Sequence, residues 1–183
     1  ENHHAVTSQC LKLAFDDVRL IASDFLDCLP DFCILGLIKA VGLFGKQEKD
    51  NNISYSSIGL LWKISDYITL ITNQDNKAKE NTTANKNNQH PESHEKKPGK
   101  RKTPLIDIAD GLQIAIFKEL QVLCVDSRAD VRNCAMQTIN SALVAYGDRL
   151  KLESWIDCIN ILKVLLTDVV VKRTRLNQQQ DEQ

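Results

Sequence analysis

Apolar residues recur every three to four positions over most of the chain, which is the spacing of one face of an α-helix. The clearest case lies between residues 128 and 146. Its apolar and small residues fall on a single stripe: Val131, Cys134, Ala135, Ile139, Ala142, Leu143 and Tyr146. We therefore predict a helix over residues 128–146 with one buried face.

The same periodicity predicts five further helices. A helix over residues 7–29 ends at Pro30, because proline lacks the backbone donor that a helix interior needs. The next helix, over residues 31–45, is apolar almost all round, so neighbours should cover it on more than one side. The remaining three helices begin near residue 53, at residue 105 and at residue 152.

The turn before the helix of residues 128–146 carries side chains that can accept hydrogen bonds. Asp126 and Ser127 are suited to cap the first amides of that helix. Arg132 lies off the apolar stripe, where its guanidinium can reach a carboxylate of a turn. We interpret Arg132 and Asp126 as a strut between neighbouring repeats, with ligand binding as the alternative.

A turn aspartate followed by Val-Arg and a small residue is typical of the second helix of a HEAT repeat. The helix that begins near residue 53 is a degenerate copy, since aligning the two lays Ile53 on Val131 and Ser57 on Ala135. The sequence thus predicts an all-α fold, a HEAT/armadillo-like right-handed α-solenoid of about six helices. Such a stack is incomplete alone, so we expect both ends to continue in a longer protein.

Residues 73–104 differ from the rest in composition. They are rich in Asn, Lys, Gln and Thr and carry eight basic against four acidic residues, with no apolar residue except Ala. We predict a long disordered insertion, because such a segment cannot bury enough apolar surface to fold. The predicted division is therefore residues 7–73, the first helical half; 74–104, the insertion; 105–172, the second half; and 173–183, a frayed tail.

Composition and charge exclude several classes of protein. Apolar residues make up 43% of the 183 residues and aromatic residues only 5%, which suits helix packing and disfavours a β-sandwich. No apolar run is long enough to span a bilayer. The net charge is −1 and the insertion contributes +4, so the folded part carries about −5 and does not support nucleic-acid binding. The basic run at residues 96–102 could be a nuclear-import signal or a patch for anionic lipid, but solvated linker charge explains it better.

The sequence offers no site for catalysis or a cofactor. Its six cysteines form no Cys-x-x-Cys pair and none is near a histidine, so we expect no metal site and a reducing, cytosolic compartment. There is no Gly-rich phosphate loop and no nucleophile with a histidine base. We therefore predict that the chain is not an enzyme and needs no cofactor.

Trp62 lies on the opposite side of its predicted helix from the apolar stripe. The simpler interpretation is that this helix packs between neighbours on both flanks, and the alternative is that Trp62 docks a partner. Asp66, one turn further on, is either a solvated residue or part of the same surface.

Two stretches resemble a known family. Residues 52–66 contain Asn-Ile-Ser followed by Leu-Leu-Trp and Ser-Asp, and residues 119–132 end in Asp-Val-Arg. Both are similar to the helical region downstream of the catalytic domain in the large Arf guanine-nucleotide exchange factors, and most of all to the related Mon-two-type Golgi and endosome scaffolds, which lack that domain. The chain departs from the family in having no proline after Arg128, and the insertion is not a family feature.

The resemblance implies a non-catalytic scaffold in vesicle trafficking, peripheral on trans-Golgi and endosomal membranes on their cytosolic side. Its implied partners are a Dopey-type scaffold, an Arf-like small GTPase and an aminophospholipid flippase. The residues we expect at a protein-binding surface are Trp62, Asp66, Arg128 and Arg132. The alternative is a module that binds anionic phosphoinositides through basic residues near the end of the solenoid: Arg149, Lys151, Lys163, Lys172, Arg173 and Arg175.

Overall fold

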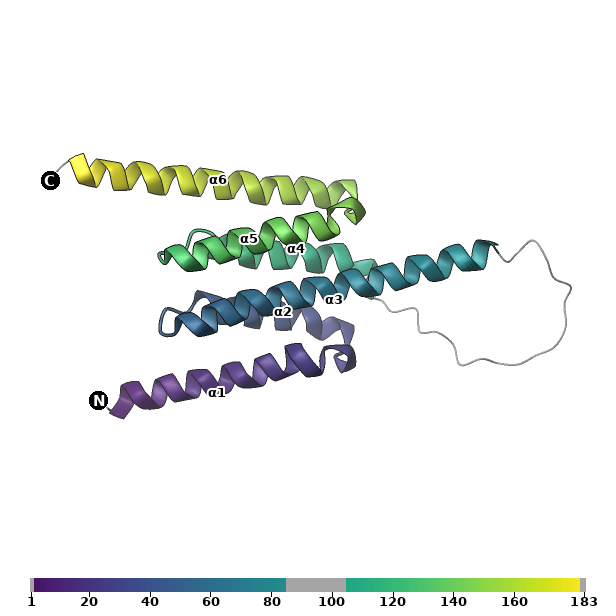
Figure 1. Cartoon of the computed structure of the whole chain (residues 1–183), viewed down its shortest axis with the longest axis horizontal. Helices are drawn as coiled ribbons and strands as arrows, with labels where there is room; N and C mark the ends of the chain where they lie inside the picture. Colours follow the sequence, from purple (N-terminus) through teal and green to yellow (C-terminus); the bar gives the residue numbers. More distant parts are fainter. Residues whose placement is uncertain (1, 85–104, 182–183) are drawn as a thin grey trace, which may run out of the picture.

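The computed structural model describes the backbone of residues 2–84 and 105–181, and the side chains of residues 8–74, 105 and 108–171. All elements in these ranges are helical, which confirms the all-α prediction for the described part of the chain (Figure 1). The elements are α1 (Asn2–Asp24), the short 3-10 helix η1 (Leu26–Cys28), α2 (Asp31–Lys46), α3 (Asn51–Ala84), α4 (Leu105–Leu123), α5 (Ala129–Tyr146), the 3-10 helix η3 (Gly147–Arg149) and α6 (Leu152–Asp181).

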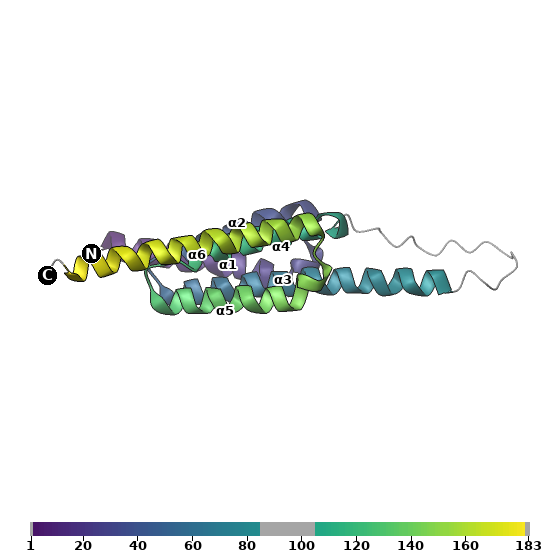
Figure 2. The same ribbon diagram turned by 90° about the horizontal axis from the view of Figure 1, so that it is seen from above.

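The helices form a stack with α1 at one end and α6 at the other (Figure 1). Seen from above, α2, α4 and α6 lie in one layer, and α3 and α5 lie in a second layer (Figure 2). Helix α3 packs against α1, α2, α4 and α5, and α4 also contacts α6. Neighbouring pairs in the chain, α2 with α3 and α4 with α5, are therefore also neighbours in space.

The first predicted helix is shorter than residues 7–29 at its C-terminal end. Helix α1 stops at Asp24, and η1 follows before Pro30 occupies the N-cap of α2. The break rotates the chain so that Leu26 is buried while Phe25 stays half exposed. Burial of Leu26 in the core thus decides where this helix ends, a tertiary effect that periodicity alone misses.

Two helices continue further than the polar composition of their ends predicted. Helix α3 runs to Ala84, and α6 runs through the tail to Asp181. Lys, Ala, Glu and Gln have high helix propensity, so a helix already held by its packed part can extend into such polar sequence. The rest of the predicted insertion, residues 85–104, lies outside the described residues, as does the structure of the basic run at 96–102.

The core consists of two clusters of buried apolar side chains, and each cluster draws residues from both layers of helices. The larger cluster joins α1, η1, α2, α3, α4 and α5 and also includes Leu165 of α6, and the smaller cluster joins α4, α5 and α6 around Phe117, Tyr146 and Cys158. Trp62 is half buried and packs against the smaller cluster. The interpretation that α3 meets neighbours on both flanks is therefore confirmed.

The positions that the sequence aligned between α3 and α5 are buried in both helices. Ile53 and Val131 are 5% and 0% exposed, and Ser57 and Ala135 are both fully buried. Small side chains at the last two positions let α3 and α5 approach closely, and the Ser57 hydroxyl donates a hydrogen bond of 2.7 Å to the Ile53 carbonyl of its own helix. A serine can therefore replace an alanine here without leaving a polar group unpaired.

We expect Leu61→Ala to lower the free energy of unfolding by about 2–5 kcal/mol, because it leaves a cavity at a fully buried position of α3. Leu43→Ala is a matched control, since Leu43 of α2 is 67% exposed, and it should change stability by less than about 0.5 kcal/mol. Urea unfolding of the two variants measures both values. Equal costs for the two substitutions would contradict the packing described above.

Candidate functional site

Arg128 ties two turns of the stack together. Its guanidinium donates to both carboxylate oxygens of Asp126 at 2.9 Å, in the bidentate geometry that arginine favours. It also donates at 3.0 Å to Asn51 Oδ1 and Ser54 Oγ, and at 3.5 Å to the Gly45 carbonyl. The α4–α5 turn is thereby joined to the end of α2 and the start of α3.

The hydrogen bonds from Asp126 raise the pKa of the Arg128 guanidinium above its ordinary value, and partial burial opposes this shift. The Arg128 side chain is 17% exposed and that of Asp126 is 9% exposed. Because the pair is largely shielded from water, removing one partner leaves the other charge partly buried and without it, which costs more than losing one member of a surface ion pair. Arg128 thus acts as a structural tie in this chain.

The predicted strut residues Arg132 and Asp126 are in contact, but within a single turn. Arg132 donates to the backbone carbonyls of Asp126 and Ser127, both at 2.8 Å, so it closes the turn before α5. The expected caps also differ: the N-cap residue of α5 is Arg128, with no side-chain capping bond, and Asp126 accepts from the Arg128 backbone amide at 2.9 Å. The guanidinium of Arg128 reaches the α2–α3 turn because Arg128 lies in the α4–α5 turn itself.

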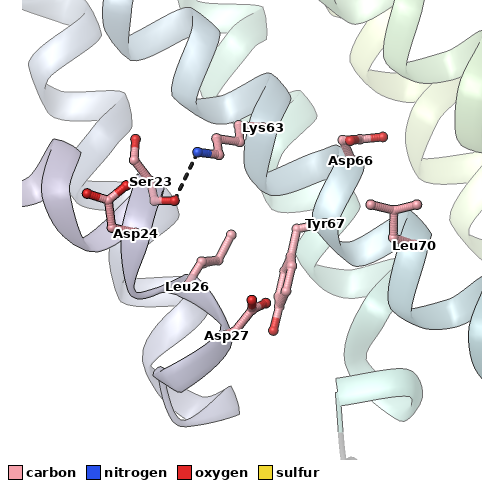
Figure 3. A pocket seen from close by; sticks show the side chains of 8 residues that line it. All are labelled: Ser23, Asp24, Leu26, Asp27, Lys63, Asp66, Tyr67 and Leu70. Carbon is pink, nitrogen blue, oxygen red and sulfur yellow. Dashed lines mark hydrogen bonds between the residues drawn. The ribbon is translucent and has the colours of Figure 1, made fainter.

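Asp66 is exposed and lines an open pocket of about 180 Å³ between the end of α1 and the middle of α3 (Figure 3). Lys63 crosses this pocket and donates to the Ser23 carbonyl at 3.0 Å. The other charged residues of the lining are Asp24 and Asp27. Three carboxylates against one ammonium group give the pocket an acidic character that suits a cationic group better than a phosphate.

Tyr67 forms one wall of the same pocket, and the Asp27 carboxylate lies beside its ring (Figure 3). Partial burial raises the pKa of the Tyr67 phenol, and the charges of Asp27 and Asp31 raise it further. The phenol therefore stays protonated at neutral pH and can only donate or accept a hydrogen bond. Nothing in this arrangement makes it a base.

The four predicted partner-binding residues fall into two separate groups. Arg128 and Arg132 lie at the edge of the stack where α3 begins, since Arg128 is bonded to Asn51. Trp62 is about 16 Å further along α3 at about 1.5 Å per residue, and Asp66 is one turn beyond it. The structure does not bring the four side chains together into one surface.

The predicted lipid-binding residues are only partly within the described side chains. Arg149 is half buried in η3, and Lys151 and Lys163 are exposed before and on α6. Lys172, Arg173 and Arg175 have side chains outside the described residues. The exposed acids Glu153, Asp157 and Asp168 accompany the two lysines along α6.

Sequence reasoning missed Asp110, a half-buried residue of α4 that organises the start of α6. Its carboxylate accepts hydrogen bonds from the Tyr146 hydroxyl at 3.1 Å, the Lys151 amide at 3.2 Å and the Ser154 hydroxyl at 3.1 Å. Burial and then the Asp110 charge raise the pKa of Tyr146, so this phenol remains a donor. The signal in the sequence is an aspartate flanked by the apolar and small residues Ala109 and Gly111 in the first half of α4.

Among the described side chains, no group of His, Cys, Asp and Glu is arranged to hold a metal ion. Burial raises the pKa of Cys124 to about 12 and that of Cys158 to about 11, so both thiols are protonated at neutral pH. They behave as small apolar residues of the core. No helix within the described residues has the length and apolar character needed to cross a membrane.

Residues 23–182, which are most of the chain, match the model of the protein family described as "C-terminal region of Mon2 protein". The chain belongs to the Mon2 family. Its similarity to the Mon-two-type scaffolds, inferred from residues 52–66 and 119–132, is thereby confirmed.

Curated relatives in the Mon2 family match most of this chain. The Caenorhabditis elegans protein "Monensin-resistant homolog 2" is 32% identical over 86% of the chain, and the human "Protein MON2 homolog" is 31% identical over 79% of it. The Xenopus laevis homologue is 31% identical over 94%. The chain spans only 8–10% of the length of these relatives. No solved structure matches the chain.

In this Mon2-family chain, we expect Arg128→Ala to lower the free energy of unfolding by about 1.5–3 kcal/mol, because the charge-assisted bonds to Asp126 and the bonds that join the α4–α5 turn to the α2–α3 turn are lost. Arg19→Ala removes an exposed ion pair with Asp16 and should cost less than about 0.5 kcal/mol. Urea unfolding monitored by circular dichroism compares the two. A cost for Arg128→Ala no greater than that for Arg19→Ala would refute its role as a tie.

Proposed function

We propose that this chain is part of the helical scaffold of a Mon2-type trafficking protein and that it binds protein partners without a catalytic step of its own. The family match over residues 23–182 carries this proposal. The chain would act on the cytosolic side of trans-Golgi and endosomal membranes, as a peripheral component. This location follows from the family resemblance.

We interpret the stack as a HEAT/armadillo-like solenoid. The pair α2 and α3 and the pair α4 and α5 occupy successive places in the two layers, and their second helices bury equivalent positions. The proposed division places the first pair in residues 7–73 and the second in residues 105–172, each with one end helix of the stack. In such proteins each pair contacts mainly its neighbours, and the surface of the stack binds partners.

Within this scaffold, Asp66 is the best placed of the four predicted partner-binding residues. It is exposed on the acidic pocket between α1 and α3, whereas Arg128 and Trp62 are engaged within the fold. Arg132 is half buried and also makes internal contacts. The partners that the resemblance suggests are a Dopey-type scaffold, an Arf-like small GTPase and an aminophospholipid flippase.

We expect Asp66→Arg to weaken binding to a purified Dopey-type protein by about tenfold or more, because reversing a charge within an interface opposes the partner's complementary charge. Arg132→Glu tests the second group of residues in the same assay. Lys39→Glu on α2 is the control, since Lys39 is exposed and lies outside both groups. Biolayer interferometry measures the affinities, and circular dichroism verifies that each variant is folded. Unchanged affinity in folded Asp66 and Arg132 variants would count against these residues.

A second candidate function is binding to anionic phosphoinositides. It is favoured by Lys151 and Lys163, which are exposed beside the exposed apolar residues Leu152, Ile156 and Ile159 of α6. Basic and apolar residues on one surface are typical of helices that lie on a membrane. The acidic residues of α6 weaken this candidate, so we rank it second.

For the second candidate, the expected result is flotation of the chain with liposomes that contain phosphatidylinositol 4-phosphate. Lys151→Glu combined with Lys163→Glu should abolish flotation, and raising the salt concentration should reduce it, because the attraction is electrostatic. A chain lacking residues 85–104 tests whether the basic run at 96–102 is responsible instead. Flotation that needs this run would contradict a site on α6.

A further inference from the structure

The acidic pocket between α1 and α3 carries more negative charge than its own lining neutralises. Asp24, Asp27 and Asp66 line it, and Lys63 is the one cation among its described lining residues. The Lys63 ammonium group is already engaged, because it donates at 3.0 Å to the Ser23 carbonyl in the last turn of α1 (Figure 3). The C-terminus of α1 adds the partial negative charge of a helix end. Most of the negative charge of the pocket is therefore left without a cation.

The pocket also suits the shape of a long basic side chain. It holds about 180 Å³ and opens on the side of the stack, between two helices of the chain. Tyr67 forms one wall, and Leu26 and Leu70 add apolar surface (Figure 3). Lysine and arginine have an apolar stem and a charged head, and an aromatic ring attracts the head as well as the stem. Apolar walls beside carboxylates thus match both parts of such a side chain.

The chain itself brings basic residues to this part of the fold. Asp31, the first residue of α2, accepts a hydrogen bond of 3.1 Å from the amide of Leu105, the first residue of α4. Asp31 lies near enough to the pocket for its charge to raise the pKa of the Tyr67 phenol. Residues 96–102 contain five basic residues and no acidic one, and they end three positions before Leu105. The basic run therefore directly precedes the point at which the chain joins α4 beside the pocket.

The length of the chain allows the basic run to reach the pocket. At about 3.3–3.6 Å per residue, Lys102 can lie up to about 10 Å from Leu105, and Lys96 up to about 30 Å. On the other side, α3 carries Ala84 about 25 Å beyond Tyr67 at about 1.5 Å per residue. The chain between Ala84 and Lys96 can span about 40 Å, which is more than this distance. Neither α3 nor α4 has to change for the run to contact the pocket.

We infer that the acidic pocket binds the basic run at residues 96–102 of the same chain, with lysine or arginine side chains of the run paired with Asp27 and Asp66. The charges of the two parts are complementary, since the insertion carries +4 and the rest of the chain about −5. A short tether keeps the run at an effective concentration on the order of millimolar at the pocket, so a modest intrinsic affinity is sufficient. A basic segment of another molecule has to compete with this internal contact.

The test is zero-length cross-linking of the full chain with a carbodiimide, which joins an amine to a carboxylate only where the two are in contact. We expect mass spectrometry of the monomer to recover lysines of the run joined to Asp24, Asp27 or Asp66. Their yield should exceed by about tenfold or more that of cross-links to Asp157 and Asp168, which are exposed on α6. Raising the salt concentration should lower the yield, because the attraction is electrostatic.

A peptide with the sequence of residues 94–104 tests the occupancy of the pocket by a second measurement, fluorescence anisotropy. It should bind about tenfold or more tightly to a neutralised chain than to the native chain, whose own run occupies the pocket. The neutralised chain carries Lys96→Gln, Lys97→Gln, Lys100→Gln, Arg101→Gln and Lys102→Gln.

Two further variants of the neutralised chain locate the binding site of the peptide. Asp27→Asn combined with Asp66→Asn should weaken peptide binding by about tenfold or more, because two carboxylate charges of the pocket are lost. Asp157→Asn combined with Asp168→Asn removes the same charge from α6 and is the matched control, for which we expect no change. Circular dichroism verifies that each variant is folded.

Cross-links that the run forms equally with the pocket and with α6 would overturn the inference. Equal affinity of the peptide for the native and the neutralised chain would also overturn it. Both measurements use the chain without a partner, so they can fail while the proposed partner binding at Asp66 holds, and the reverse.

Discussion

Helix α3 packs against four other helices, α1, α2, α4 and α5, and the arrangement of the stack depends on these close contacts. A helix enclosed in this way must present small side chains where backbones approach and apolar side chains elsewhere. Its buried Ser57, Thr69 and Thr72 meet the first need, and each hydroxyl donates to a carbonyl of its own helix. Ser65 instead accepts a hydrogen bond from Gln113 of α4, which fixes the two helices in register. Close packing is thus achieved without leaving these hydroxyls unpaired.

Polar contacts between the helix pairs complete this packing at its edges. Arg128 joins the α4–α5 turn to the α2–α3 turn, and Lys46 of α2 pairs with Glu119 of α4 at 2.7 Å. Gly42 leaves room for the Glu119 side chain, because a Cβ atom there would clash with it. At the opposite edge, Asp110 holds the first turn of α6. These partly buried contacts define how one helix pair is placed on the next, while the apolar core supplies most of the stability.

The surface on which we propose that a partner binds lies outside this framework of ties. The acidic pocket between α1 and α3 opens on the side of the stack and is lined by three carboxylates, those of Asp24, Asp27 and Asp66. A partner that binds there leaves the contacts between the helix pairs intact.

Periodicity in the sequence determined the number and approximate position of the helices, because a buried stripe every 3.6 residues is a local property. It also identified Val131, Ala135 and Ser57 as buried, and the resemblance of residues 52–66 and 119–132 gave the family. The tertiary structure alone decided that Arg128, rather than Arg132, connects the α4–α5 turn to the α2–α3 turn, and that Asp110 organises the start of α6. Only the tertiary structure shows that α1 ends at Asp24, and that Trp62 and Asp66 lie away from Arg128 and Arg132. The physical reason is that these outcomes depend on distances between segments far apart in the sequence, which local patterns do not encode.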